Sequence, residues 1–242
     1  KVEEFTREAF PAARIARLDM DTARGKGSTE QILRHFGQGK TDILIGTQLV
    51  AKGLDFENVG LVGVVSGDIT LNIPDYRSPE RTFQLITQVA GRAGRGTEIG
   101  SVVIQTYSPQ HYSIRAAAKQ DFKAFYESEI LIREALVYPP YSDLILVVLA
   151  ASTEEEATGG TEKIREAFLR RVGREHEEYI LGPKASPMNK IKSLYRHQLL
   201  IRCLPEHKEK YQRALRQIRE KAINEKGSAW SLSIDINPYG FL

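Results

Sequence analysis

Short apolar runs alternate with helical patterns along the first half of the chain. The runs that read as strands lie at residues 13–19, 42–47, 60–66 and 101–106, and the helical patterns lie at residues 2–9, from Ser28 onward and at residues 79–93. Ser78 and Pro79 are typical of a helix start, which places Ser78 as the N-cap of the third helix. Buried strands that alternate with helices form a mainly parallel sheet with helices on both faces. The pattern of the first half of the chain therefore predicts the α/β fold class, with a sheet that corresponds to half of a doubly wound domain.

The pattern changes after two more helical stretches, at residues 110–119 and 121–137. The segment YPPY stops the second one, because proline cannot continue a helix. The chain then reads as strand, helix, strand, strand, helix and strand, at residues 143–152, 153–172, 179–182, 193–203, 205–225 and 231–236. This βαββαβ order predicts a ferredoxin-like α+β domain. We expect a first domain at residues 1–112, a helical connector at residues 113–137 and the ferredoxin-like domain at residues 138–242.

Composition excludes several classes of protein. The 242 residues are 41% hydrophobic and 27% charged, which is ordinary for a globular protein. No apolar run is long enough to cross a bilayer, and the first ten residues do not resemble a signal peptide, so we expect a cytoplasmic protein that does not bind a membrane. Cys203 is the single cysteine. It can form no disulfide within the chain and no cysteine-based zinc site, and we expect it to lie buried in a strand.

Positive charge is concentrated in the last domain. Residues 183–219 hold ten basic side chains and two acidic ones, which indicates a surface for a polyanion. The alternative is an ordinary solvated face of lysines and arginines.

The decapeptide TQVAGRAGRG, residues 87–96, ends one of the predicted helices. Arg92 and Arg95 are three residues apart and therefore share a helical face, while Gly91 and Gly94 allow another molecule to approach the backbone closely. This arrangement suits a phosphate group. The alternative is a helix end closed by glycine, in which basic residues only complement the helix dipole.

A second polar segment follows the predicted strand at residues 42–47. Open α/β sheets bind ligands at the carboxyl ends of their strands. Thr47 and Gln48 offer hydrogen-bonding side chains. Lys52 offers a cation, Gly53 a flexible backbone and Asp55 a carboxylate.

The stretch GQGKTD, residues 37–42, is not a phosphate-binding P-loop. Arg34 stands where the first glycine of that loop is required, and the stretch precedes a strand instead of opening a helix. Because the sequence holds no other P-loop, we expect that this chain alone cannot bind and hydrolyse a nucleotide.

The two polar segments together resemble motifs V and VI of superfamily 2 helicases. The longer tracts DILIGTQLVAKGLDFENV and LNIPDYRSPERTFQLITQVAGRAGRG resemble the bacterial PriA family, primosomal protein N′, and the resemblance continues through YPPYSDL and ILGPKASPMNK. It implies the C-terminal portion of an ATP-dependent DNA helicase that recognises stalled or branched forks and restarts replication by primosome assembly. The first domain would then be part of a RecA-like second helicase lobe.

The resemblance also implies roles for single residues. Arg92 and Arg95 would act as arginine fingers that stabilise charge on the transferring γ-phosphoryl group, with Gln88 helping to position that side of the site. The residues that would couple nucleotide state to the grip on DNA are Gly53, Asp55, Gly91 and Gly94. Those that would contact the DNA backbone in the first domain are Thr47, Gln48 and Lys52.

The last domain resembles the family's C-terminal module, which is implied to contribute to branched-DNA recognition. The DNA contacts expected in and beside the loop before the strand at residues 193–203 are Lys184, Lys190, Lys192 and Arg196. A weaker set lies on the next helix: Lys208, Lys210, Arg213 and Arg216. Tyr195 could stack on a base, although a lone tyrosine in a strand is more often part of a core.

The family further implies cofactors and partners. ATP and Mg²⁺ would be bound mainly by the first helicase lobe, and zinc would belong to the intact family protein but not to this segment. The implied partners are forked and single-stranded DNA, the single-strand-binding protein and primosome proteins.

Two other classes of function compete with this interpretation. The second half could be a nucleic-acid-binding module of the RRM type, although such a module needs several exposed aromatics and only Tyr195 is placed for that role. The chain could also be a protein-interaction scaffold. A steep salt dependence of DNA binding by residues 138–242 would argue against a scaffold.

Overall fold

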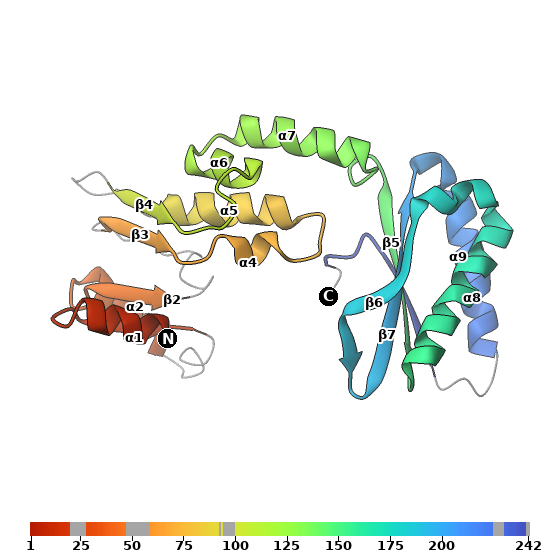
Figure 1. Ribbon diagram of the computed structural model, residues 1–242, viewed down its shortest axis with the longest axis horizontal. Coiled ribbons are helices and arrows are strands. Elements are labelled where there is room, and N and C mark those ends of the chain that lie inside the picture. The colour runs from red at the N-terminus through yellow and green to blue at the C-terminus, as the bar shows by residue number, and fades with distance from the viewer. Residues whose placement is uncertain (20–27, 47–58, 92, 94–99, 225–229, 241–242) are drawn as a thin grey trace. The chain divides into compact units, whose positions relative to one another are not determined.

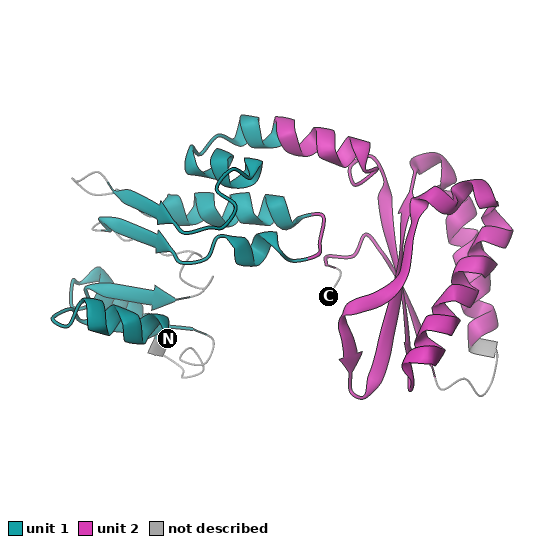
Figure 2. Ribbon diagram, viewed as in Figure 1, with its two compact units in different colours: residues 1–73, 77–126 teal, residues 74–76, 127–242 magenta. Residues whose placement is uncertain are grey.

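A computed structural model of the chain describes residues 1–19, 28–46, 59–91, 93, 100–224 and 230–240 (Figure 1). Contacts divide the chain into two compact units. The first unit holds residues 1–73 and 77–126, and the second, called the C-terminal unit below, holds residues 74–76 and 127–242 (Figure 2).

The first unit begins with a parallel pair of strands and two helices. These elements are α1 (Val2–Ala9), β1 (Ile15–Leu18), α2 (Ser28–Gly37) and β2 (Ile43–Gly46). Strands β1 and β2 pair in parallel from Ile15 opposite Ile43. Just before the strands, the Arg14 guanidinium donates to both Asp42 carboxylate oxygens, at 2.9 and 2.6 Å. These hydrogen bonds lower the pKa of Asp42.

The first unit continues with a second parallel pair. Its elements are β3 (Leu61–Val64), α4 (Asp68–Leu71), α5 (Ser78–Ala90) and β4 (Ser101–Ile104). Strand β3 pairs with β4 in parallel, from Leu61 opposite Ser101. In the described part of the chain, the parallel strands thus form two separate pairs, and the predicted α/β class is confirmed.

Helix α5 differs from its prediction at both ends. It stops at Ala90 instead of residue 93, and Arg77 occupies the N-cap position. The N-cap prediction for Ser78 was wrong, because the Ser78 hydroxyl donates to the Ile73 carbonyl instead (2.7 Å). The short helix α4 was not predicted, since a single turn carries no helical period.

Three helices pack together in the middle of the chain. Helices α6 (Tyr112–Ala118) and α7 (Phe122–Ala135) form a cluster of buried apolar side chains with α5. The Phe83 and Phe125 rings stack with their centroids 4.4 Å apart. The division between the two units falls within α7, after Tyr126.

The C-terminal unit contains a four-stranded sheet and two long helices. Its elements are β5 (Asp143–Ala151), α8 (Glu154–Val172), η2 (Arg174–Tyr179), β6 (Ile180–Ile191), β7 (Leu194–Cys203), η3 (Pro205–His207), α9 (Lys208–Asn224) and β8 (Ser231–Ile236). The strand order is β6-β7-β5-β8, and every neighbouring pair is antiparallel. This is the arrangement that the βαββαβ order predicted.

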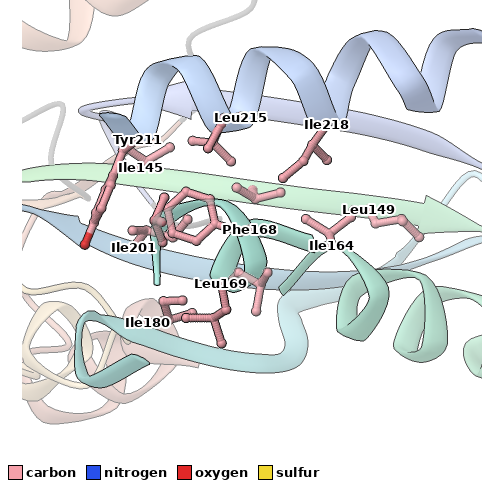
Figure 3. Packing of buried hydrophobic residues seen from close by; sticks show 14 of the residues in the cluster. Ile145, Leu149, Ile164, Phe168, Leu169, Ile180, Ile201, Tyr211, Leu215 and Ile218 are labelled. Carbon is pink, nitrogen blue, oxygen red and sulfur yellow. The ribbon is translucent and has the colours of Figure 1, made fainter. Parts of the chain in front are cut away.

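Helices α8 and α9 cover one face of this sheet and form its main core with it (Figure 3). Phe168 and Tyr211 meet edge to face in this core, with ring centroids 5.0 Å apart. Helix α8 begins at a capping box between Thr153 and Glu156, which satisfies two backbone N–H groups. Cys203 lies buried in β7 as predicted.

The other face of the sheet carries a smaller apolar cluster. Its members are Leu144, Leu146, Val148 and Leu200, with Tyr76, Tyr138 and Leu181 packed against them. Both faces of the sheet therefore bury apolar side chains, which explains why β5 reads as a continuous apolar run.

Strand β6 is much longer than the predicted strand at residues 179–182. It spans twelve residues and forms a hairpin with β7. Lys192 and Ser193, with φ values of 48° and 66°, form the two-residue turn. The prediction was wrong because bulges in β6, between Leu181 and Lys184 and between Ala185 and Lys190, interrupt the alternation of polar and apolar residues.

Candidate nucleic-acid interface and helicase motif

The motif at residues 87–96 begins on the last turn of α5. Gln88 is exposed, while Phe83 and Ile86 bury the opposite side of the helix. Gly91 closes the helix in a right-handed conformation, and its N–H donates to the Thr87 carbonyl at 3.0 Å. Arg92, Gly94 and Arg95 lie outside the described residues. The structure thus places Gln88 and Gly91 together and leaves the roles of the arginines as a prediction.

The second predicted segment directly follows β2. Because β1 and β2 are parallel, Gly46 ends at the carboxyl edge of this pair, which is where the ligand-binding segment was expected. The residues predicted there lie outside the described part of the chain: Thr47, Gln48, Lys52, Gly53 and Asp55.

Asp68 connects the carboxyl ends of β3 and β4. One of its carboxylate oxygens accepts from the Thr106 hydroxyl at 2.8 Å, and the other accepts from the Tyr107 N–H at 2.9 Å. These bonds, led by the one from Tyr107, lower the pKa of Asp68. Sequence reasoning missed this residue, because its partners are almost forty residues away in the chain.

The basic residues expected in and beside a loop all lie on the β6–β7 hairpin. Lys184 and Lys190 belong to β6, Lys192 is in the turn and Arg196 belongs to β7. The three lysines are exposed and Arg196 is partly buried. The structure brings these four cations onto one supersecondary element, which we call the basic hairpin.

The cations of the basic hairpin point to both faces of the sheet. Lys190 pairs with Tyr195, whose ring packs against the helix-covered core, while Arg196 alternates to the opposite face. Lys184 pairs with Gln198 and so shares the face of Arg196. A polyanion can therefore meet positive charge from either side of the hairpin.

Tyr195 is not placed to stack on a base. Its ring packs against the core on the helix side of the sheet, and the Lys190 ammonium lies 4.4 Å from the ring centroid. The same ammonium donates to the Tyr195 hydroxyl at 3.1 Å. The tyrosine therefore orients a lysine, which favours the core alternative over the stacking one.

Two of the weaker candidates on α9 make contacts inside the C-terminal unit. Lys208 forms an ion pair with Asp143 at 2.8 Å, which lowers the pKa of that carboxyl. Lys210 approaches the buried His176, with its ammonium 3.1 Å from Nε2. Arg213 lines a surface groove of 420 Å³ with Arg171.

The described residues contain no helix that could cross a membrane. Within the same residues, no three His, Cys, Asp or Glu side chains gather in a way that could hold a metal ion.

Comparison with known proteins connects these features to a class of protein. Residues 1–97 match the helicase conserved C-terminal domain, and residues 134–239 match the primosomal protein N C-terminal domain. The fold and the helicase motif therefore define a helicase-family protein with a primosomal C-terminal domain.

Individual relatives give the family. Three proteins named Replication restart protein PriA, from Bacillus subtilis, Chlamydia trachomatis and Thermotoga maritima, are 45%, 42% and 36% identical to the chain over 99%, 84% and 92% of its length. The chain belongs to the PriA family of replication restart proteins and corresponds to the C-terminal part of such a protein. It spans 29%, 27% and 30% of the length of these relatives.

Proposed function

We propose that the chain forms part of the second lobe and the C-terminal domain of an ATP-dependent DNA helicase. The helicase acts in the bacterial cytoplasm at stalled or branched replication forks and restarts replication by primosome assembly. The observation that carries this proposal is the match to a replication restart protein over 99% of the chain, at 45% identity. Residues 1–112 supply the lobe, residues 113–137 the connector and residues 138–242 the C-terminal domain.

The first unit contributes to phosphoryl transfer through the end of α5. ATP with Mg²⁺, bound mainly by the other helicase lobe, supplies the phosphoryl group. Arg92 and Arg95 stabilise the charge that develops on it, because a planar guanidinium binds phosphate oxygens in pairs. Gln88, exposed on the last turn of α5, positions this side of the site.

The segment after β2 links nucleotide state to DNA. Gly53 and Asp55, with Gly91 and Gly94 of the other segment, couple the nucleotide site to the DNA-binding surface. The residues that contact the DNA backbone are Thr47, Gln48 and Lys52. Contacts to the DNA backbone position the DNA strand without reading its base sequence, as a helicase requires.

The basic hairpin supplies the C-terminal contacts to forked and single-stranded DNA. The local charge supports this role, because residues 183–219 hold ten cations and two carboxylates. The geometry supports it as well, since Lys184 and Arg196 share one face of the hairpin and Lys190 is held on the other by Tyr195. The single-strand-binding protein and primosome proteins are partners of the same domain.

Charge reversal in the intact protein tests this proposal. The triple variant Lys190→Glu, Lys192→Glu, Arg196→Glu is compared with wild type for binding to forked DNA across a range of salt concentrations. Each lost phosphate contact lowers the slope of log affinity against log salt by about 0.9. We therefore expect weaker binding on every sequence and a slope that is flatter by about two to three.

The control reverses two exposed cations of helix α8, Lys163 and Arg170, and is compared per reversed charge. It should leave both the affinity and the slope close to wild type. An unchanged slope in the folded hairpin variant would show that the basic hairpin does not bind DNA. Equal losses in the variant and in the control would point to general attraction by net charge.

A further inference from the structure

The short segment 74–76 joins the two units at an unexpected point in the chain. Helix α4 before it and helix α5 after it both belong to the first unit, but residues 74–76 belong to the C-terminal unit (Figure 2). Three residues shortly before α5, the helix that carries Gln88, therefore belong to the C-terminal unit.

Tyr76 packs this segment against the C-terminal unit. Its ring stacks on the Tyr138 ring, with centroids 5.3 Å apart and planes inclined by 18°. It also packs against the apolar cluster of Leu144, Leu146, Val148 and Leu200 on the sheet. Aromatic stacking and apolar burial both favour this single position of the ring.

A positioned cation lies over Tyr76. The Arg133 guanidinium carbon is 5.2 Å from the ring centroid. Its Nε donates to Glu129 at 2.7 Å, and its Nη1 donates to the Pro139 carbonyl at 3.3 Å. The Arg133 and Glu129 side chains are only 15% and 8% exposed, so the cation is partly desolvated and its attraction to the ring is strengthened.

Helix α5 starts two residues after Tyr76. The Ser78 hydroxyl ties the helix start to the Ile73 carbonyl, and the Thr82 hydroxyl donates to the Ser78 carbonyl at 2.8 Å. Thirteen residues of α-helix extend over about 20 Å, from Ser78 to the turn that carries Gln88. Any displacement of Tyr76 is therefore applied to the start of a helix whose other end bears the helicase motif.

We propose that Tyr76 is a positioning residue that couples DNA binding by the C-terminal domain to the nucleotide site at the end of α5. The proposal rests on the proposed function. Packed contacts of this kind hold discrete arrangements, so a change in the sheet on DNA binding is transmitted to the start of α5. Tyr76 contacts no substrate in this proposal and acts only through the helix.

The test measures ATP turnover by the intact protein without DNA and at saturating forked DNA. Four proteins are compared: wild type, Tyr76→Ala, Tyr76→Phe and the control Tyr107→Ala, whose side chain is 94% exposed. For Tyr76→Ala we expect the ratio of stimulated to basal turnover to fall about five-fold or more. Basal turnover and DNA affinity without nucleotide should stay within about two-fold of wild type, because neither depends on the coupling.

The conservative variant separates coupling from a general structural role. Tyr76→Phe keeps the ring for Tyr138 and Arg133 and should restore the ratio, and Tyr107→Ala should not change it. If Tyr76→Ala does not fold, the same ratio is measured for Tyr76→Leu, because leucine keeps the apolar burial but offers no ring. A ratio within about two-fold of wild type in the folded alanine or leucine variant would overturn the proposal.

The same experiment distinguishes this inference from the proposed function. Wild-type protein without DNA-stimulated ATP turnover would contradict the proposed function itself. Normal stimulation in wild type together with normal stimulation in the Tyr76 variants would contradict only the coupling.

Discussion

Two adjacent glycines of helix α8 should respond differently to alanine substitution, because only one of them has room for a methyl group. A Cβ added at Gly159 meets nothing within 4 Å, and the residue is exposed. A Cβ added at Gly160 lies 2.8 Å from Cδ1 and 3.3 Å from Cδ2 of Leu149. Leu149 is fully buried in the core beneath α8, so its side chain has little room to move.

The magnitudes follow from this geometry. Alanine is favoured over glycine in a helix interior by about 1 kcal/mol, so Gly159→Ala should stabilise the C-terminal unit by about that amount. Gly160→Ala gains the same helix propensity but forces a methyl group into a filled core, which costs about 1–3 kcal/mol. We expect Gly160→Ala to be neutral or destabilising, and about 1–3 kcal/mol less stable than Gly159→Ala.

Urea unfolding measures this difference in free energy. Trp230 is the only tryptophan of the chain and packs against the core of the C-terminal unit, so its fluorescence reports that unit. Equal stabilisation by both substitutions would refute the reasoning, because it would mean that Leu149 yields to the new methyl group without cost.

Two further predictions concern buried titratable groups of the C-terminal unit. Burial, followed by the charges of Lys210 and His207, lowers the pKa of His176 below its ordinary value of 6.5, with Glu175 opposing the shift. As the pH falls, the unfolded chain therefore binds a proton at this histidine before the folded chain does. The free energy of unfolding should show no loss from His176 above pH 6.5 and should decrease as the pH falls below it. His176→Gln should flatten this decline in urea unfolding at pH 5.5–7.5, and an equally steep decline in the variant would contradict the assignment. Burial also raises the pKa of Cys203 to about 11, so a thiol reagent at pH 8 should label it only in urea, and rapid labelling of the folded chain would contradict this.

The sequence predicted the elements that have a clear period. The order of strands and helices after residue 138 was enough to predict the four-stranded sheet, because β5 and β7 are largely apolar, β8 alternates between polar and apolar residues and each helix has a buried stripe. The helicase motif was recognised from the two polar segments together and from the longer tracts around them. These features depend on local patterns, which a single sequence records directly.

Features that depend on distant contacts were not predictable in this way. The length of β6 was missed because two bulges break its alternation, and Lys184 and Lys190 were therefore not placed on a strand. Tyr76 was missed because its partners Tyr138 and Arg133 lie about sixty residues further along the chain. Asp68 was missed for the same reason. Such residues carry no signal until the fold brings their partners together.

We propose that the segment directly after α5 supplies arginines to phosphoryl transfer. The most direct measurement is DNA-stimulated ATP turnover by the intact protein at saturating DNA, for wild type, Arg92→Ala, Arg95→Ala and Arg95→Lys. Arginine fingers contribute about 10³–10⁵ in rate, so the alanine variants should lose turnover far more than nucleotide binding. Arg95→Lys should recover little, because an ammonium group cannot form the paired contacts of a guanidinium, and DNA affinity without nucleotide should persist. Turnover within a few-fold of wild type in both alanine variants would show that TQVAGRAGRG is only a helix end closed by glycine.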